Sequence, residues 1–339
     1  MLTLSIVIPA VGSIESLEST LVSVLENRPP QCEIIVVLNR PYADPYELKE
    51  EVRFIEAERG TGLPDCANIG VRHAHARVAH VLASGVHATP NWTSAALRHF
   101  DNPQVAAVAP AIVDQAEQQV IAGGVRYWAG GSRRVQQCNI AAIAKLSNKS
   151  PFAPALSAGF YCKAALQRVG GFTTQLGDEL ADADLAVALS QAGLQVRFEP
   201  DARLIAMSAP EPCESSWRQG LYAERLFWRN APAVGWWKSL AFHPWTVAAR
   251  AARSMPSLAT LAQLAGRFLA CCDVGHYPPR HAQLRSLVAG SKRTTTGTTD
   301  PHLRVDASHA ARQSSSPTER RAGQSESLPE RRPERRIAS

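Results

Sequence analysis

The chain has 339 residues, of which 45% are apolar and 19% charged, so it can form a hydrophobic core and is not a wholly disordered protein. Its net charge of +6 lies mainly in residues 291–339, which hold ten Lys and Arg against six Asp and Glu. The charge is therefore no sign of a nucleic-acid-binding face. No run of about 18 uncharged apolar residues exists, which excludes a polytopic membrane protein.

The first residues have no basic segment and no small-residue cleavage site, so they predict a strand rather than a signal peptide. The seven cysteines are scattered, odd in number and without a CxxC pair. This pattern favours neither a zinc ribbon nor a disulfide framework, and a reducing compartment is the simplest setting. We therefore expect a cytoplasmic protein.

Apolar periodicity predicts alternating strands and helices over the first 200 residues. In chain order we expect a strand at 4–8, a helix at 14–25, strands at 33–38 and 52–55, a helix from Asp65 to about 76, and a strand at 78–82. Further strands are expected at 105–108, 120–127, 158–162 and 196–198, and further helices at 163–169, 182–192, 215–230 and 257–272. This order predicts an α/β fold with a Rossmann-like, mostly parallel sheet flanked by helices. Ligands of such sheets bind beyond the carboxyl ends of the strands, here at 9–12, 38–41 and 83–87.

The composition changes after residue 210, where five of the seven Trp fall between 217 and 245 among Arg and Lys. We expect three parts: a domain over 1–210, a helical, Trp/Arg-rich extension over 211–290, and a disordered tail over 291–339 with too few large apolar residues to fold. The Trp-rich segment suits a helix at a membrane interface and equally a helical cap packed on the sheet. Both interpretations stay open.

Several short segments, in this order, resemble those of family 2 glycosyltransferases, which have the GT-A fold. They are Leu4–Pro9, Glu33–Val37, Gly62–Gly70, Ala158–Lys163, Val169–Phe172, Asp182–Leu185 and Pro200–Asp201. The resemblance covers about residues 2–230. It implies a nucleotide-sugar donor, a saccharide or lipid-linked acceptor and, as a rule, inversion of the anomeric centre. It also suggests a role in polysaccharide biosynthesis at the cell envelope, with contact to the inner face of the cell membrane.

The same resemblance implies that the donor lies against the strand ends. The residues that match are Pro9, Asn39, Asp44, Gly62, Asn68, Ser84 and Gly85. Asn39 and Asp44 equally suit Asx turns. Gly62 and Asn68 bracket a loop that enters a helix, whose free N–H groups attract phosphate, while Asp65 is a good N-cap for that helix.

The acid that matches the family's general base is Asp182, which would take the proton of the acceptor hydroxyl. We expect it in the first turn of the predicted helix at 182–192, where acids are also common for dipole reasons alone. Asp184 and Gly159 fall on the acceptor side. The Glu that members usually carry before the base is Ala181 here.

The family's metal-binding Asp-x-Asp motif falls on Ala83-Ser84-Gly85. Mg²⁺ or Mn²⁺ is expected from the family, but these hard cations need carboxylate ligands, and this segment has none. We therefore predict no metal ligands here. Two functions stay open: an active glycosyltransferase, and a degenerate relative that binds a nucleotide-sugar or a protein partner without turnover. No nucleic-acid partner is expected.

Overall fold

The computed structural model describes residues 2–128, 130–146, 152–207, 216–234, 236–254 and 257–272. The chain divides into two units, Met1–Ser291 and Lys292–Ser339, and every described residue belongs to the first. The tail expected at 291–339 lies outside the described residues. The boundary expected near residue 210 falls inside the first unit and stays a prediction.

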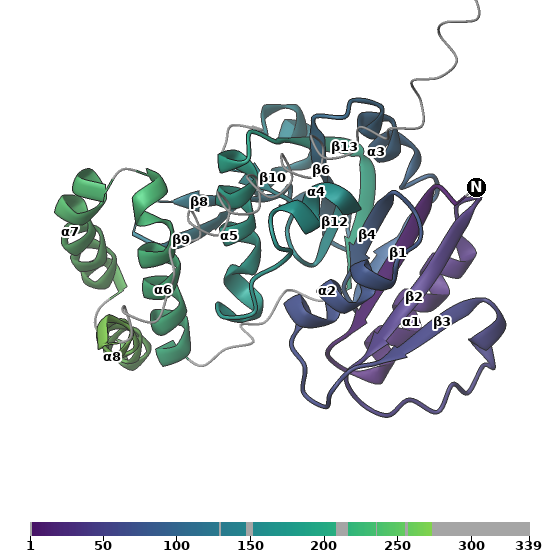
Figure 1. Cartoon of the computed structure of the whole chain (residues 1–339), viewed down its shortest axis with the longest axis horizontal. Helices are drawn as coiled ribbons and strands as arrows, with labels where there is room; N and C mark the ends of the chain where they lie inside the picture. The colour runs from purple at the N-terminus through teal and green to yellow at the C-terminus, as the bar shows by residue number, and fades with distance from the viewer. Residues whose placement is uncertain are drawn as a thin grey trace, which may run out of the picture. The chain divides into compact units, whose positions relative to one another are not determined.

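The first half of the fold is a parallel βαβ arrangement (Figure 1). Its main elements are β1 (Leu4–Ala10), α1 (Ile14–Glu26), β2 (Cys32–Leu38), β3 (Val52–Glu56), α2 (Leu63–His73) and β4 (Val78–Leu82). β1 pairs in parallel with β2 and β4, and β2 pairs in parallel with β3. The predicted alternation of strands and helices is confirmed here, with boundaries that differ by a few residues.

The second half adds strands to the same sheet and forms a small second sheet. Its elements are β5 (Val86–Ala88), α3 (Ser94–Arg98), β6 (Val105–Val113), β7 (Gln119–Ala122), β8 (Val125–Trp128), β9 (Ser132–Val135), β10 (Cys138–Asn139), β11 (Phe152–Ala153), β12 (Ala158–Cys162), α4 (Lys163–Arg168), α5 (Gly177–Gln191) and β13 (Gln195–Ala206). The large sheet runs β10-β7-β6-β12-β4-β1-β2-β3, with β13 beside β6 and β5; β11, β8 and β9 form the small one. The α/β fold is confirmed, although β12 lies antiparallel to β4 and β6.

Helices cover both faces of the large sheet because its central strands are buried on both sides. On one face Ile6 and Ile8 of β1 pack in one cluster with Leu21 of α1. On the other face Val7 packs with Val71 of α2. A Cβ on Gly70 would stand 2.2 Å from Val7 Cγ1, so the missing side chain lets α2 lie close to the sheet. The carboxyl ends of β1, β2 and β4 are thereby fixed at one edge.

Three predicted boundaries are wrong for identifiable reasons. The helix expected at 182–192 begins at Gly177, so Asp178 and Glu179 form its acidic first turn and Asp182 lies in its interior. The helix expected from Asp65 begins at Leu63. β13 continues to Ala206 because a register shift between Glu199 and Arg203 accommodates the intervening proline, which a regular strand interior would not.

The strand expected at 120–127 is two strands, β7 and β8, separated at Gly123 and Gly124. Gly124 has a φ of +106°, a backbone conformation that residues other than glycine rarely adopt. This conformation ends the first strand. The chain turns there and β8 joins the small sheet. This turn carries β8 and β9 away from the large sheet and toward the C-terminal helices.

The described C-terminal region is helical, with α6 (Ser216–Val234), α7 (Trp236–Ser254) and α8 (Leu258–Cys272). α6 and α8 match the expected helices, whereas α7 was not predicted. α6 and α8 touch through their backbones, since a Cβ on Gly266 would lie 1.8 Å from the carbonyl oxygen of Trp217. None of the helices in the described ranges is both long and apolar enough to cross a membrane.

Candidate functional site

The ends of β1 and β4 are joined at the edge where ligands of parallel sheets bind. The hydroxyl of Ser84 donates to the carbonyl of Pro9 at 3.1 Å, and the Gly85 N–H donates to Thr20 Oγ1 at 2.9 Å. Gly85 has a φ of +87°, and no atom lies within 4 Å of where its Cβ would stand. The structure thus brings Pro9, Ser84 and Gly85 together, as the sequence predicted for the donor edge.

The end of β2 borders a cleft of about 490 Å³ lined by Asn39, Arg40, Pro41, Arg59 and Gly60. Asn39 is 6% exposed, and its Nδ2 donates to the carbonyl of Thr61 at 2.9 Å. Arg40 and Arg59 are exposed at the cleft. We call this space the donor cleft, after the ligand that the family resemblance implies at this edge; its charged lining is basic.

Asp44 serves the turn after β2. Its Oδ1 accepts the Leu48 N–H at 3.0 Å, at the start of a short 3₁₀ helix, and its own φ is +49°. The side chain is 9% exposed. Asp44 therefore stabilises the local loop, but its partner lies four residues on and not two, so the contact is not the expected Asx turn.

The amino end of α2 is already capped by a carboxylate. Asp178 Oδ1, from the first turn of α5, accepts the Leu63 N–H at 3.0 Å, and Gly62 is the N-cap residue. A Cβ on Gly62 would stand 2.7 Å from Asp178 Oδ1. The expected N-cap role of Asp65 is therefore wrong, and the carboxylate of Asp178 stands where a phosphate was expected.

Asn68 fastens α2 to the turn before α5. Its Nδ2 donates to the Phe172 carbonyl at 2.8 Å, and its Oδ1 accepts the Phe172 N–H at 2.9 Å. Both polar atoms of the amide are thus engaged with one backbone segment. Asn68 holds the loop from Gly62 in place rather than offering its amide at the donor cleft.

Asp182 is 1% exposed and forms a forked pair with Arg133 of β9. Arg133 Nε lies 2.9 Å from Oδ1, and Arg133 Nη2 lies 2.8 Å from Oδ2. The Leu156 N–H donates to Oδ2 at 3.1 Å. Burial would lower the pKa of Arg133, but the Asp182 carboxylate outweighs this effect and raises it. The guanidinium is 27% exposed on the outer side of the pair.

Asp182 lies close to the donor edge through one short backbone segment. Leu156 binds Asp182, and the carbonyl of the next residue, Ser157, accepts the Ala83 N–H at 2.8 Å. Sequence reasoning did not find Arg133 as a partner of Asp182, since 49 residues separate them and β9 was not predicted. No local sequence pattern indicated this pair.

The two acceptor-side candidates are buried. Gly159 lies in β12, where a Cβ would stand 2.5 Å from both Pro154 Cβ and Tyr161 Oη. Burial raises the pKa of Tyr161 well above its usual value, and the charge of Asp182 adds to the effect. Asp184 is 0% exposed; its Oδ1 lies 3.2 Å from Arg229 Nε and 3.1 Å from Asn230 Nδ2, both of α6. Asp184 thus joins α5 to α6.

The residues at the Asp-x-Asp position do not fit a divalent metal ion. Ala83 and Gly85 have no side-chain ligand atom, their carbonyl oxygens accept backbone hydrogen bonds, and the Ser84 hydroxyl donates to a carbonyl. Within the described ranges, no group of three or more His, Cys, Asp or Glu side chains is placed to hold a metal. Hard cations require such oxygen ligands.

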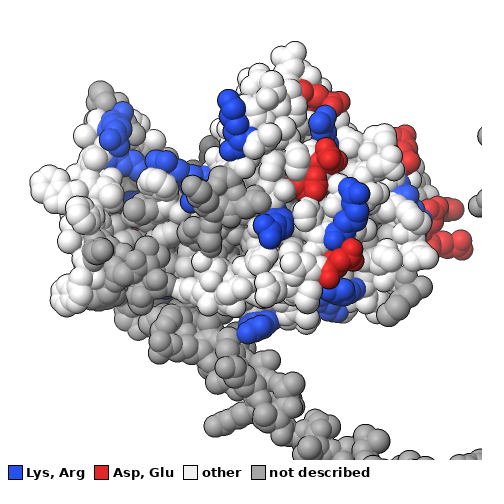
Figure 2. All heavy atoms as spheres, turned by 90° about the horizontal axis from the view of Figure 1, so that it is seen from above, with Lys and Arg blue, Asp and Glu red and all other residues white. Residues whose placement is uncertain are grey.

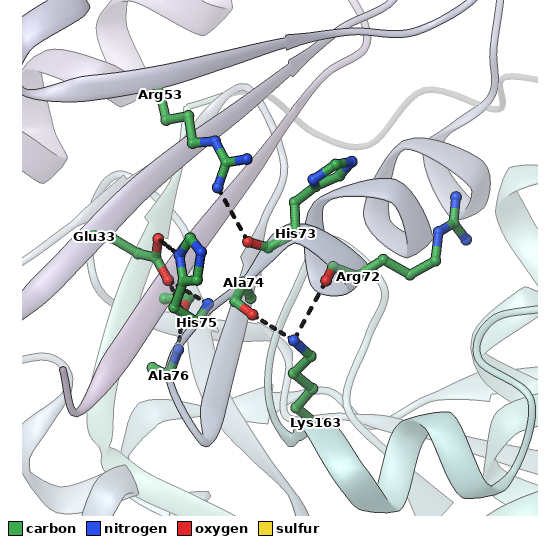
Figure 3. A network of polar contacts seen from close by, with 9 residues as sticks. Glu33, Arg53, Arg72, His73, Ala74, His75, Ala76 and Lys163 are labelled. Carbon is green, nitrogen blue, oxygen red and sulfur yellow. Dashed lines mark hydrogen bonds and ion pairs between the residues drawn. The ribbon is translucent and has the colours of Figure 1, made fainter.

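The histidines near this motif belong to no metal-holding group among the described residues. His75 Nδ1 lies 2.8 Å from Glu33 Oε2, in the polar network drawn in Figure 3, where the His73 carbonyl accepts from Arg53. His80 is 0% exposed, its ring lies tilted against that of Phe160 with the centroids 3.9 Å apart, and burial lowers its pKa to about 3. These histidines do not converge on the donor edge.

Comparison with known proteins identifies the class. Residues 5–139 match the model of the family described as glycosyl transferase family 2. No curated protein matches the sequence. The resemblance that the motifs indicate is confirmed over residues 5–139, which match this family model, and the fold is GT-A-like.

Two solved structures show how widely the fold is shared. One is a mannosyltransferase, PcManGT from Pyrobaculum calidifontis, in complex with GDP-Man and Mn²⁺; the identity is 16%, the TM-score 0.50, and 86% of each chain is covered. The other is GalNAc-T7 with UDP, GalNAc and Mn²⁺; the identity is 16%, the TM-score 0.54, and the match covers 82% of this chain and 58% of that one. At these identities the likeness concerns the fold.

Proposed function

We propose that the chain transfers a sugar from a nucleotide-sugar, held at the donor cleft and the β1–β4 edge, to a saccharide or lipid-linked acceptor with inversion. The observation that carries this proposal is the short connection from Asp182 through Leu156 and Ser157 to Ala83. It puts a carboxylate beside the edge where the family's donor lies. The two similar structures are complexes with GDP-Man and with UDP, which supports a nucleotide diphosphate as the leaving group.

In this proposal the acceptor oxygen bonds to the anomeric carbon while the bond from that carbon to the diphosphate breaks. Asp182 takes the proton of the acceptor hydroxyl. Because Arg133 binds both oxygens of Asp182, the proposal requires Arg133 to release the carboxylate before this step. The side chains of Arg40 and Arg59 compensate the charge of the departing diphosphate, because the residues at the family's metal position do not fit a cation.

The second candidate function is binding without turnover. It is favoured by the Asp182 carboxylate, which is buried and bonded through both oxygens, and by the missing carboxylates at Ala83 and Gly85. This alternative predicts nucleotide-sugar binding without release of nucleoside diphosphate. The active enzyme releases it in the presence of an acceptor and, slowly, to water.

A thermal-shift experiment tests the donor cleft. UDP, GDP and their sugars should raise the melting temperature, since a ligand at 100 times its dissociation constant adds about 2.7 kcal/mol to stability. Arg40→Gln/Arg59→Gln should lose most of this shift. Arg53→Gln/Arg98→Gln removes the same charge elsewhere and should keep it. No shift with any nucleotide would contradict the donor cleft.

We also propose peripheral contact of α7 and α8 with the inner face of a membrane, in keeping with an envelope acceptor. Large apolar side chains are exposed on both helices: Trp237 at 81%, Trp245 at 75%, Leu258 at 84% and Phe268 at 73%. Aromatic and basic residues together suit the headgroup region. The vesicle measurement described below tests this contact with Trp237→Ala.

A further inference from the structure

A second cleft lies between the β8–β9 hairpin and the helices α7 and α8, apart from the donor cleft, and has a volume of about 510 Å³. We call it the arginine cleft. Five arginines line it: Arg133, Arg134, Arg250, Arg253 and Arg267. No Asp or Glu is among the lining residues. In the view from above in Figure 2, basic side chains gather along a hollow on the α7 side, while the visible acidic side chains lie elsewhere.

Part of this arginine cluster is held in place by the fold. Arg267 Nη1 lies 2.7 Å from Glu224 Oε2 of α6, and Arg134 stacks over the Trp128 ring at 4.0 Å. Arg133 is paired with Asp182 in the structure. These contacts orient three guanidinium groups before any ligand arrives, which reduces the entropy that a ligand must overcome.

The arginines of the cleft lie close enough to one another for their charges to interact. The pKa of Arg250 is lowered, first by burial and then by the charges of Arg267 and Arg134. Like charges brought this close repel one another, and an anion placed among them would relieve that repulsion. Arg253 is exposed at the end of α7, where it can reach the same anion.

We propose that the arginine cleft binds a phosphate group, held by Arg134, Arg250 and Arg253, with the Trp128 and Trp245 rings beside it. Planar guanidinium groups match phosphate oxygens in a fork geometry and are the side chains best suited to this ligand. The volume falls within the range of small-ligand pockets and exceeds what a bare phosphate needs. The space beside the two tryptophan rings suits an apolar or ring-shaped part of the same ligand.

This site goes beyond the proposed function, since it concerns a second anion away from the donor cleft and its binding needs no transfer. Arg133 nevertheless links the arginine cleft to the proposed catalytic site, because it lines the cleft and pairs with Asp182. The phosphate can come from a soluble phosphate ester or from a lipid headgroup. Both offer the same chemistry to the arginines.

The test measures both sources with the full chain. Titration with pyrophosphate and glycerol 3-phosphate probes soluble ligands, and co-sedimentation with phosphatidylglycerol against phosphatidylcholine vesicles probes lipid. Arg250→Gln/Arg253→Gln should weaken binding about tenfold or more, the loss typical of charged hydrogen bonds. The charge-matched control Arg98→Gln/Arg168→Gln should bind as the wild type, and binding should fall with added salt.

The donor-cleft variant Arg40→Gln/Arg59→Gln separates this inference from the proposed function, since it should retain the phosphate binding that the arginine-cleft variant loses. Binding of the soluble ligands, or of anionic vesicles alone, supports the site and identifies its source. Equal binding by the arginine-cleft variant and the wild type, or no binding of either source, overturns it. In the vesicle arm, unchanged sedimentation of Trp237→Ala removes that side chain from the membrane contact.

Discussion

Asp182→Asn is expected to lower sugar transfer by about 10²–10⁴-fold while leaving donor binding unchanged. Asparagine keeps the shape of the side chain and one oxygen for the Leu156 N–H, but it cannot take the proton of the acceptor hydroxyl. The measurement is kcat and KM for the donor, together with nucleotide binding by titration. The expected effect lies in kcat, because the residue acts on the reacting proton rather than on the nucleotide.

Asp178→Asn is the matched control, since Asp178 lies in the same helix and serves as a cap for α2. Asparagine can still accept the Leu63 N–H, so transfer should change little. A melting curve of both variants shows whether loss of the Arg133 pair has unfolded the protein. Unchanged turnover in a folded Asp182→Asn variant would place the base elsewhere, with Asp178, Glu179 and Asp184 next to be examined.

Asp184→Asn is expected to reduce the free energy of unfolding by about 3–5 kcal/mol. Arg229 is 8% exposed, and removing the charge of Asp184 leaves its buried guanidinium beside the neutral Gln175 without this carboxylate. The measurement is urea unfolding at neutral pH. Because the pair joins α5 to α6, we expect α6 to loosen first, which amide exchange would detect.

Two further variants check the cause. Asp184→Leu/Arg229→Met removes both charges and should be more stable than Asp184→Asn, because no buried charge is left uncompensated. Glu51→Gln breaks the exposed Arg28–Glu51 pair and should cost at most about 1 kcal/mol. If Asp184→Asn is as stable as the wild type, the acceptor-side role that the sequence suggested becomes the better interpretation.

The first half of the fold could be predicted from the sequence because its strands are buried runs of Val and Ile separated by helices of apolar spacing. β4 was predicted at 78–82 and lies there. The interior of α5 could not be predicted. It places two acids, Asp182 and Asp184, among buried alanines. In the sequence alone, two such acids look like the exposed, acidic first turn of a helix. α7 was missed because Pro244 interrupts its sequence.

For the site, local motifs predicted which strand ends meet but not which groups they engage. Ser84 and Pro9 were expected at one edge and are hydrogen-bonded there. Asn68 and Asp44 looked like ligand contacts, yet their amide and carboxylate bind backbone within the fold. Arg133 and the arginine cleft depend on β9 and α7, which no local pattern indicated. Contacts between residues far apart in the sequence, such as that of Arg133 with Asp182, could not be predicted from local patterns.

We propose that the domain binds a nucleotide diphosphate without the usual metal ligands. Isothermal titration of UDP and GDP, with and without Mn²⁺, tests it most directly. Binding to the wild type should change little with Mn²⁺, while Ala83→Asp/Gly85→Asp should bind more tightly when the metal is present. The positive φ of Gly85 costs that variant about 1–3 kcal/mol of stability, so Ala83→Asp alone serves as a second variant. Wild-type binding that requires Mn²⁺ would contradict the account.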